Sequence, residues 1–230
     1  MKKLSKRLQK AKNLLNKEEY SIKEAVELLK KTASANFIES TEAHVSLNID
    51  PKYADQQLRT TLVLPKGTGK TVRLAVLLPE EKIKPEYNEQ ADIVGSNDLI
   101  EEITKGNIDF DILIASPDMM PKLAKLGRVL GPKGLMPSPK SGTVTDDISS
   151  TIDQFKKGKV EYKADRTGIV HLSFGKTSFS NEDLLENLVA FYQSVEQNKP
   201  SGVKGKYFKS FYICNTMGPS ISISLSDLKV

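Results

Sequence analysis

The chain has 230 residues, 34 of them Lys or Arg and 29 Asp or Glu, and a formal net charge of +5. An apolar fraction of 38% beside 27% charged residues excludes a disordered chain and is typical of one or two folded domains. A single cysteine excludes an internal disulfide framework and a Cys-rich zinc site, and the longest wholly apolar run is far below the ~20 residues of a membrane span. We therefore expect no cofactor, no metal site and no membrane contact. The Lys-rich, Arg-poor composition is typical of an AT-rich genome, bacterial or plastid.

The N-terminal part predicts a basic helix, an amphipathic helix and two strands. Residues 1–12 carry six basic side chains and no acid, but lack the apolar core of a signal peptide. Ser21 and Glu24 form a capping box ahead of apolar residues at helical spacing. Alternation of apolar and polar residues predicts strands at 44–50 and 60–64.

The pattern changes to strand–helix alternation between two Gly- and Lys-rich segments, 65–71 and 156–159. Near-continuous apolar strands that alternate with helices predict a small parallel sheet covered on both faces. The strands are expected at 72–78, 91–94 and 112–115, and the helices at 98–104, from about 118, and at 148–155.

Half-exposed strands return after residue 159, with a helix that Ser180 caps. These strands are expected at 160–163, 169–174, 207–215 and 220–224. We predict an α/β two-domain protein. A split α+β domain with an antiparallel sheet comes from both termini (1–66 and 160–230), and a Rossmann-like α/β domain with a small parallel sheet is inserted (67–159). The split domain has a net charge of +6 and the inserted one of −1, so a polyanion should prefer the split domain. Its hinges are expected at Gly67, Gly69 and Gly158.

The stretch 126–145 has no acidic residue and is interrupted by Gly and Pro, which predicts a long loop. Its one-sided charge favours a polyanion, and a solvated basic loop is the alternative. We assign a tRNA or secondary RNA contact to this loop and its flank, at Lys125, Arg128, Lys133 and Lys140.

No catalytic site is predicted. The segment Gly67–Thr71 lacks the earlier Gly of a nucleotide-binding phosphate loop, because Leu64 stands there. The two histidines, His44 and His171, are far from Cys214 in sequence, and His171 fits a partner contact and an idle surface position equally well. By default Phe37 and Met217 are core side chains beside turns.

Five segments in order resemble the bacterial-type ribosomal protein L-one family of the large subunit's mobile stalk. They are Asp50–Arg73, Asp109–Met120, Leu126–Thr145, Gly168–Phe179 and Thr216–Ser220. The resemblance covers essentially the whole chain and implies a non-enzymatic protein that is a monomer when free. It implies binding to large-subunit rRNA of the stalk, help in moving and releasing deacylated tRNA at the exit site, and translational repression through its own mRNA. The ribosome would be that of a plastid (chloroplast) or a bacterial cytoplasm, the composition slightly favouring a plastid.

The resemblance also implies the rRNA contacts. These correspond to Phe37, Ser40, Glu42, Ser210, Thr216, Met217 and Gly218, with His171, Lys176 and Ser178 carried over from a shared motif. The chain departs from the family at Asn36, Ser40, Thr41 and Ser222, which predicts a somewhat weaker site with a shallower salt dependence. The alternatives are a free-standing RNA-binding regulator of the same fold and, third, a nucleotide-binding enzyme.

Overall fold

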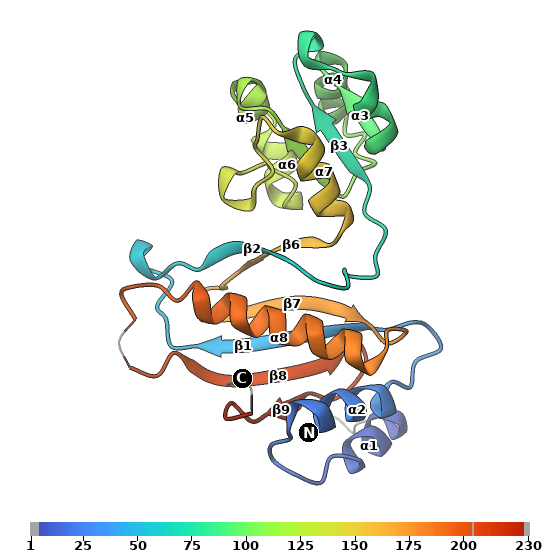
Figure 1. Cartoon of the computed structure of the whole chain (residues 1–230), viewed down its shortest axis with the longest axis vertical. Coiled ribbons are helices and arrows are strands. Elements are labelled where there is room, and N and C mark those ends of the chain that lie inside the picture. Colours follow the sequence, from blue (N-terminus) through green and yellow to red (C-terminus); the bar gives the residue numbers. More distant parts are fainter. Residues whose placement is uncertain (1–4, 204, 228–230) are drawn as a thin grey trace. The chain divides into compact units, whose positions relative to one another are not determined.

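The computed structural model describes residues 5–203 and 205–227, and the chain forms two compact units. Unit 1 comprises Met1–Gly69 and Val160–Val230, and unit 2 comprises Lys70–Lys159 (Figure 1). Among the described residues, none of the helices combines the length and the apolar character that crossing a bilayer requires.

Unit 1 is built on a four-stranded sheet in the order β7-β1-β8-β9. Its neighbouring strands are all antiparallel, so the expected antiparallel sheet from both termini is confirmed. The strands are β1 (Ser40–Leu47), β7 (Ile169–Lys176), β8 (Phe208–Asn215) and β9 (Ile221–Ile223).

Strand β1 occupies different residues from the predicted 44–50. It begins at Ser40, whose carbonyl accepts a hydrogen bond from the Thr216 N–H at 3.1 Å. It ends at Leu47, and beyond it the Asp50 N–H donates to the side chain of Gln56 rather than to a neighbouring strand. Long-range pairing therefore extends the strand at its start, and a local contact with Gln56 replaces pairing beyond its end.

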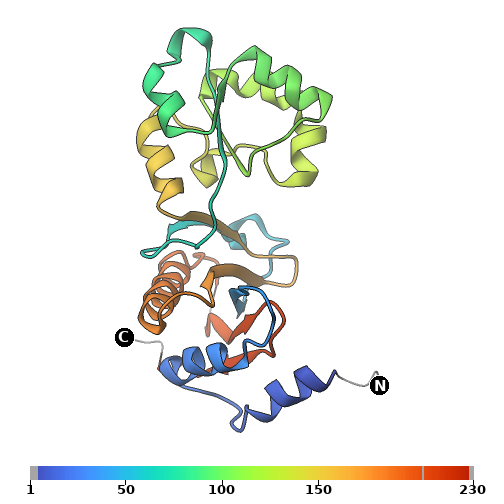
Figure 2. The ribbon, with the colours of Figure 1, turned by 90° about the vertical axis from the view of Figure 1, so that its right-hand side faces the viewer.

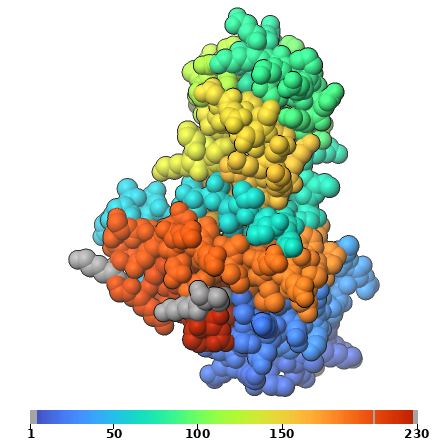
Figure 3. Space-filling model, in the orientation of Figure 1, coloured from blue at the N-terminus to red at the C-terminus, as the bar shows by residue number. Residues whose placement is uncertain are grey.

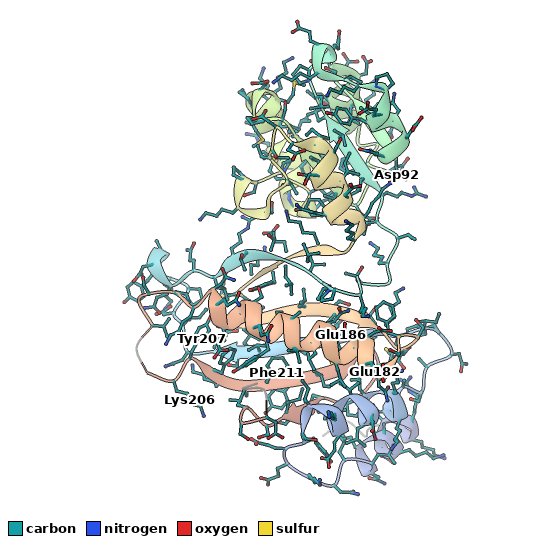
Figure 4. The ribbon with its side chains drawn as sticks, in the orientation of Figure 1. Asp92, Glu182, Glu186, Lys206, Tyr207 and Phe211 are labelled. Atoms are coloured by element: carbon teal, nitrogen blue, oxygen red, sulfur yellow. The ribbon has the colours of Figure 1, made fainter. Side chains whose placement is uncertain are left out.

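Two capped helices cover one face of this sheet, α2 (Ile22–Thr32) and α8 (Asn181–Gln197). Figure 1 shows α8 in front of the sheet, and Figure 2 shows it to the left of the strands. Phe211 of β8 lies behind α8 (Figure 4), with its ring centroid 6.2 Å from that of Phe191. The core of unit 1 thus lies between this helix pair and the sheet.

The remaining elements of unit 1 are a basic helix, a short 3-10 helix and a two-stranded sheet. They are α1 (Lys6–Asn13), η1 (Ala54–Gln56), β2 (Arg59–Val63) and β6 (Lys159–Lys163). Arg59 and Glu161 form an ion pair across β2 and β6. The first four residues of the expected basic segment lie outside the described residues.

Unit 2 has a three-stranded parallel sheet in the order β4-β3-β5, with every residue of the central strand buried. Apolar clusters pack on both faces, as predicted. The strands are β3 (Leu74–Leu77), β4 (Ile93–Gly95) and β5 (Ile112–Ala115). The α-helices are α3 (Pro85–Gln90), α4 (Asn97–Lys105), α5 (Met120–Ala124), α6 (Gly127–Lys133) and α7 (Ile148–Lys156), and the 3-10 helices are η2 (Glu80–Lys82), η3 (Pro117–Met119) and η4 (Pro139–Ser141). Helix α3 was not predicted.

Candidate nucleic-acid interface

The sheet of unit 1 turns a polar face away from the helices, on the side opposite to the α8 surface seen in Figure 3. Successive strand residues point to opposite faces, and β1 alternates between half-exposed and buried positions along its whole length. We call this surface the open face. Its members are Ser40, Glu42, His44, Ser46, His171, Ser173, Ser210, Tyr212, Cys214 and Ser222.

Strand register places polar side chains side by side on the open face. His44 lies between His171 on one neighbouring strand and Tyr212 on the other. Glu42 is opposite Cys214, and Ser46 is opposite Ser210. The face therefore presents mainly hydroxyls, imidazoles and a carboxylate, with Lys176 opposite Ser40 at one end. This composition suits readout of shape and hydrogen bonds more than simple charge attraction.

Three large apolar side chains are exposed at the end of the sheet where β1 begins and β8 ends: Ile38, at 60%, and two predicted contacts. Phe37 is 56% exposed and Met217 is 47% exposed. The default expectation that both belong to the core is therefore wrong, and one buried residue binds the loop before Phe37 and the turn of Met217.

That residue is Glu39, only 1% exposed. Its Oε1 accepts the N–H groups of Ser34 and Ala35, both at 3.1 Å, and its Oε2 accepts the N–H of Met217 at 2.9 Å. One buried carboxylate thus joins the loop that carries Phe37 to the turn that carries Met217. Sequence reasoning missed Glu39, although its position in phase with the buried residues of β1 is a usable signal.

The predicted rRNA contacts all lie in unit 1, and eight of the ten gather at this end of the sheet. The Ser40 N–H donates to Oγ1 of Thr216 at 3.1 Å, and the Gly218 N–H donates to the carbonyl of Asn215 at 3.0 Å. Lys176 pairs with Ser40 across β7 and β1, and Ser178 is exposed in the turn that follows. With Lys176 and Ser178, those at this end are Phe37, Ser40, Glu42, Thr216, Met217 and Gly218, while His171 and Ser210 lie farther along the open face.

The structure brings His44 next to Cys214, which sequence spacing did not reveal. The Nε2 of His44 is 3.2 Å from Sγ of Cys214, and its Nδ1 is 2.8 Å from Nδ1 of His171. Burial lowers the pKa of His44, His171 lowers it further, and Glu42 opposes both. Burial, with a contribution from Glu42, raises the pKa of the Cys214 thiol.

The predicted basic loop of unit 2 is more ordered than expected. It contains helix α6 with Pro132 in its last turn, and Leu126 and Leu130 are buried beneath it. Pro132 has no N–H to donate to the Arg128 carbonyl, and the helix is short and ends at Gly134, whose φ is positive. Among the residues that the structure describes, no ion pair involves the four exposed cations Lys125, Arg128, Lys133 and Lys140.

The predicted hinge glycines have positive φ angles, 69° at Gly67, 70° at Gly69 and 102° at Gly158. Non-glycine residues rarely adopt this conformation. Gly67 is also anchored, because its carbonyl accepts a hydrogen bond of 3.0 Å from Nδ2 of the buried Asn187 on α8.

Comparisons with known proteins match the whole chain. The model of the "Ribosomal protein L1p/L10e family" matches residues 29–219. "Large ribosomal subunit protein uL1c" of Guillardia theta is 61% identical over 229 residues, covering 100% of this chain and 98% of the relative. The uL1c protein of Phaeodactylum tricornutum is 65% identical over 205 residues, 89% of each chain. "Large ribosomal subunit protein uL1" of Trichodesmium erythraeum is 57% identical over 228 residues, covering 99% and 96%. With identity at this level over nearly every residue, and the fold that the resemblance implied, the chain belongs to the ribosomal protein L1 family.

Proposed function

We propose that this chain, a structural constituent of the large ribosomal subunit, binds large-subunit rRNA through the open face of unit 1 and the turns at its end. The supporting observation is the pair of exposed side chains, Phe37 and Met217, whose turns share hydrogen bonds to the buried Glu39. An exposed apolar pair on a fixed backbone suits bases splayed out of a folded RNA.

The rest of the open face supplies the polar part of such a contact. Serine hydroxyls and the Glu42 carboxylate can bond 2′-hydroxyls and base amino groups, which phosphate-seeking lysines do not distinguish. The net charge of +6 on the residues of unit 1 adds nonspecific attraction to the RNA backbone. Recognition and attraction are thus carried by different residues of the same unit.

The test compares Phe37→Ala and Met217→Ala with a Lys133→Ala/Lys140→Ala control in unit 2, all in the full chain. Loss of a base stacked on an aromatic ring costs about 1–3 kcal/mol, so we expect Phe37→Ala to raise Kd for stalk rRNA roughly 5- to 150-fold. Met217→Ala loses an apolar contact and should also raise Kd. Their free energies of unfolding should stay within about 0.5 kcal/mol of wild type, because both side chains are exposed. A larger loss in the control than in either variant would move the primary site to unit 2.

The cations of α5–η4 are the proposed contact for exit-site tRNA. These side chains are exposed and have no carboxylate partner within the described chain, which leaves them available for phosphates: Lys125, Arg128, Lys133 and Lys140.

The chain would pivot between the units near Gly69 and Gly158, outside the anchor that holds Gly67. Repression through an mRNA with a similar structure would use the same open face.

The family consists of ribosomal proteins and not enzymes, so the prediction of a non-enzymatic protein is confirmed. We place the protein on the ribosome of a plastid or a bacterium, and the uL1c relatives favour the plastid. The alternative is a free-standing RNA-binding regulator. Sedimentation separates the two, because a ribosomal component is stoichiometric with large subunits and a regulator is not.

A further inference from the structure

The chain has two histidines and one cysteine in 230 residues, and the fold brings all three together on the open face. Three different strands, β1, β7 and β8, contribute them. Glu42 completes the group, with Oε2 3.7 Å from Nε2 of His44. The ligand atoms of Glu42, His44 and Cys214 all lie within 4.8 Å of one another.

We propose that Glu42, His44 and Cys214 form a Zn²⁺ site on the open face, with water as the fourth ligand. A thiolate, an imidazole and a carboxylate are the three donor types that Zn²⁺ takes in proteins. Tetrahedral bonds of about 2.0–2.3 Å hold neighbouring donor atoms about 3.3–3.8 Å apart. The observed separations from His44 Nε2, 3.2 Å to sulfur and 3.7 Å to oxygen, need only side-chain adjustment to meet that geometry.

Exposure and charge also suit this ion. The side chains of His44 and Glu42 are 28% and 40% exposed, so solvent reaches the fourth position. Binding transfers the thiol proton of Cys214 to solvent, and the resulting thiolate and carboxylate balance the two charges of the metal. The three ligands are held by paired strands rather than by a loop, which keeps their backbone fixed.

His171 is placed to orient His44 from the opposite side of its ring. If Nε2 of His44 binds the metal, its Nδ1 carries the proton and donates to Nδ1 of His171 at 2.8 Å. His171 then has its own proton on Nε2, which faces Oδ2 of Asp165 at 3.7 Å. His171 is therefore a positioning residue, and the series Asp165–His171–His44 resembles the outer partners that fix ligand tautomers in metal sites.

Co²⁺ titration of the chelator-treated full chain tests the site without RNA. Thiolate ligation of Co²⁺ gives a charge-transfer band in the near ultraviolet, and Cys214 is the chain's sole thiol. We expect a band that saturates at one Co²⁺ per chain and is bleached by Zn²⁺. Cys214→Ser should abolish it, His44→Gln and Glu42→Gln should weaken Co²⁺ binding at least tenfold, and His171→Gln should weaken it about 10–100-fold while keeping the band.

Tyr212→Phe is the matched control, since Tyr212 neighbours His44 on the same face, and it should leave Co²⁺ affinity unchanged. Alkylation of Cys214 gives a second readout, which Zn²⁺ should slow at least tenfold in the wild type and not in Glu42→Gln. Absence of the band in the wild-type chain overturns the proposal. So does a band whose affinity is unchanged in both His44→Gln and Glu42→Gln, because a thiol alone would then account for it.

Discussion

At the scale of single residues, one buried acid organises the proposed RNA surface. Glu39 spends both carboxylate oxygens on backbone N–H groups from segments about 180 residues apart in the chain. Its backbone carbonyl also accepts the N–H of Thr177 at 3.0 Å, which brings in the turn after β7. Two segments at the end of the sheet therefore depend on the buried side chain of Glu39, and a third is bound to its backbone.

Replacement of Glu39 tests whether RNA affinity depends on how the turns of Phe37 and Met217 are positioned. In Glu39→Gln the amide NH₂ faces at least one N–H, so the free energy of unfolding should fall by about 1–3 kcal/mol. Affinity for stalk rRNA should fall as well, although Glu39 touches no RNA. Urea denaturation measures the first effect, with the exposed Glu27→Gln as control. Equal stability of the two variants would show that the turns are held by other contacts.

Asp165, in the turn between β6 and β7, makes a pH-dependent contribution to the free energy of unfolding. Hydrogen bonds from the Ile169 N–H and from Thr167 hold the pKa of Asp165 below its ordinary value of 3.8. A lowered pKa in the fold means that ionised Asp165 stabilises the protein above pH 3.8, and that this stability is lost as the pH falls through the lower, folded value.

We therefore expect the difference in unfolding free energy between wild type and Asp165→Asn to be constant near neutral pH and to shrink below pH 3.8. Urea denaturation at a series of pH values measures it. A difference that stays constant down to the acid transition would contradict the role given to the carboxylate.

At the scale of elements, helix α8 does more than cover the sheet. Asn187 on its buried face is fully enclosed and bonds three backbone groups. Its Oδ1 accepts the Lys66 N–H at 3.0 Å, and its Nδ2 donates to the carbonyls of Gly67 at 3.0 Å and Phe174 at 2.8 Å. The helix thereby fixes both a strand of the sheet and the chain that leaves toward unit 2.

Asn187→Ala should release that exit segment. We expect a loss of about 1–3 kcal/mol in stability, because three backbone groups lose a partner, and faster amide exchange at Lys66. Urea denaturation measures the stability, and amide hydrogen exchange measures the protection of Lys66. Gln193→Ala is the control, because Gln193 is exposed on the same helix. Unchanged exchange at Lys66 would place the anchor elsewhere.

The elements that the sequence predicted well are those set by local chemistry. Ser21 and Ser180 cap α2 and α8, their hydroxyls accepting the N–H groups of Glu24 and Asp183. Alternation marked β7 and β8 to within two residues at each end. Helices α3 and α6 were missed because proline and glycine suppress the helical pattern, although proline is tolerated in a first turn.

The candidate site was less predictable, because its geometry comes from strand register. His44 and Cys214 are 170 positions apart, and only the pairing of β1 with β8 brings them together. Successive residues of a strand point to opposite faces, so the exposure of Glu42 and Ser210 could be predicted from the sequence. Which residues of neighbouring strands are opposite each other could not be predicted. The exposure of Phe37 and Met217 depends on the buried Glu39, a long-range effect of the same kind.

At the scale of the whole molecule, charge is divided unequally between the two units. The residues of unit 1 carry the entire positive excess, +6 against −1 for those of unit 2. Because the proposed contact residues and the excess charge belong to the same unit, unit 1 should suffice for both the affinity and the salt dependence of rRNA binding.

A shortened chain in which a flexible linker replaces Lys70–Lys159 tests this. We expect its Kd for stalk rRNA to stay within about tenfold of the full chain, with the same slope of log K against log salt. Binding across a salt series measures both, and circular dichroism checks that the sheet forms. A slope markedly shallower than that of the full chain would show that cations of unit 2 also reach the RNA.

The central position of β1 also determines when unit 1 can form during synthesis. This strand leaves the ribosome early, yet its partners end at Lys176 and Asn215, long after all of Lys70–Lys159 has been made. Unit 2 can therefore complete its own contacts first. Until β7, α8 and β8 have been made, the apolar side of β1 has nothing to cover it. Unit 2 should thus fold before unit 1, although synthesis begins with residues of unit 1.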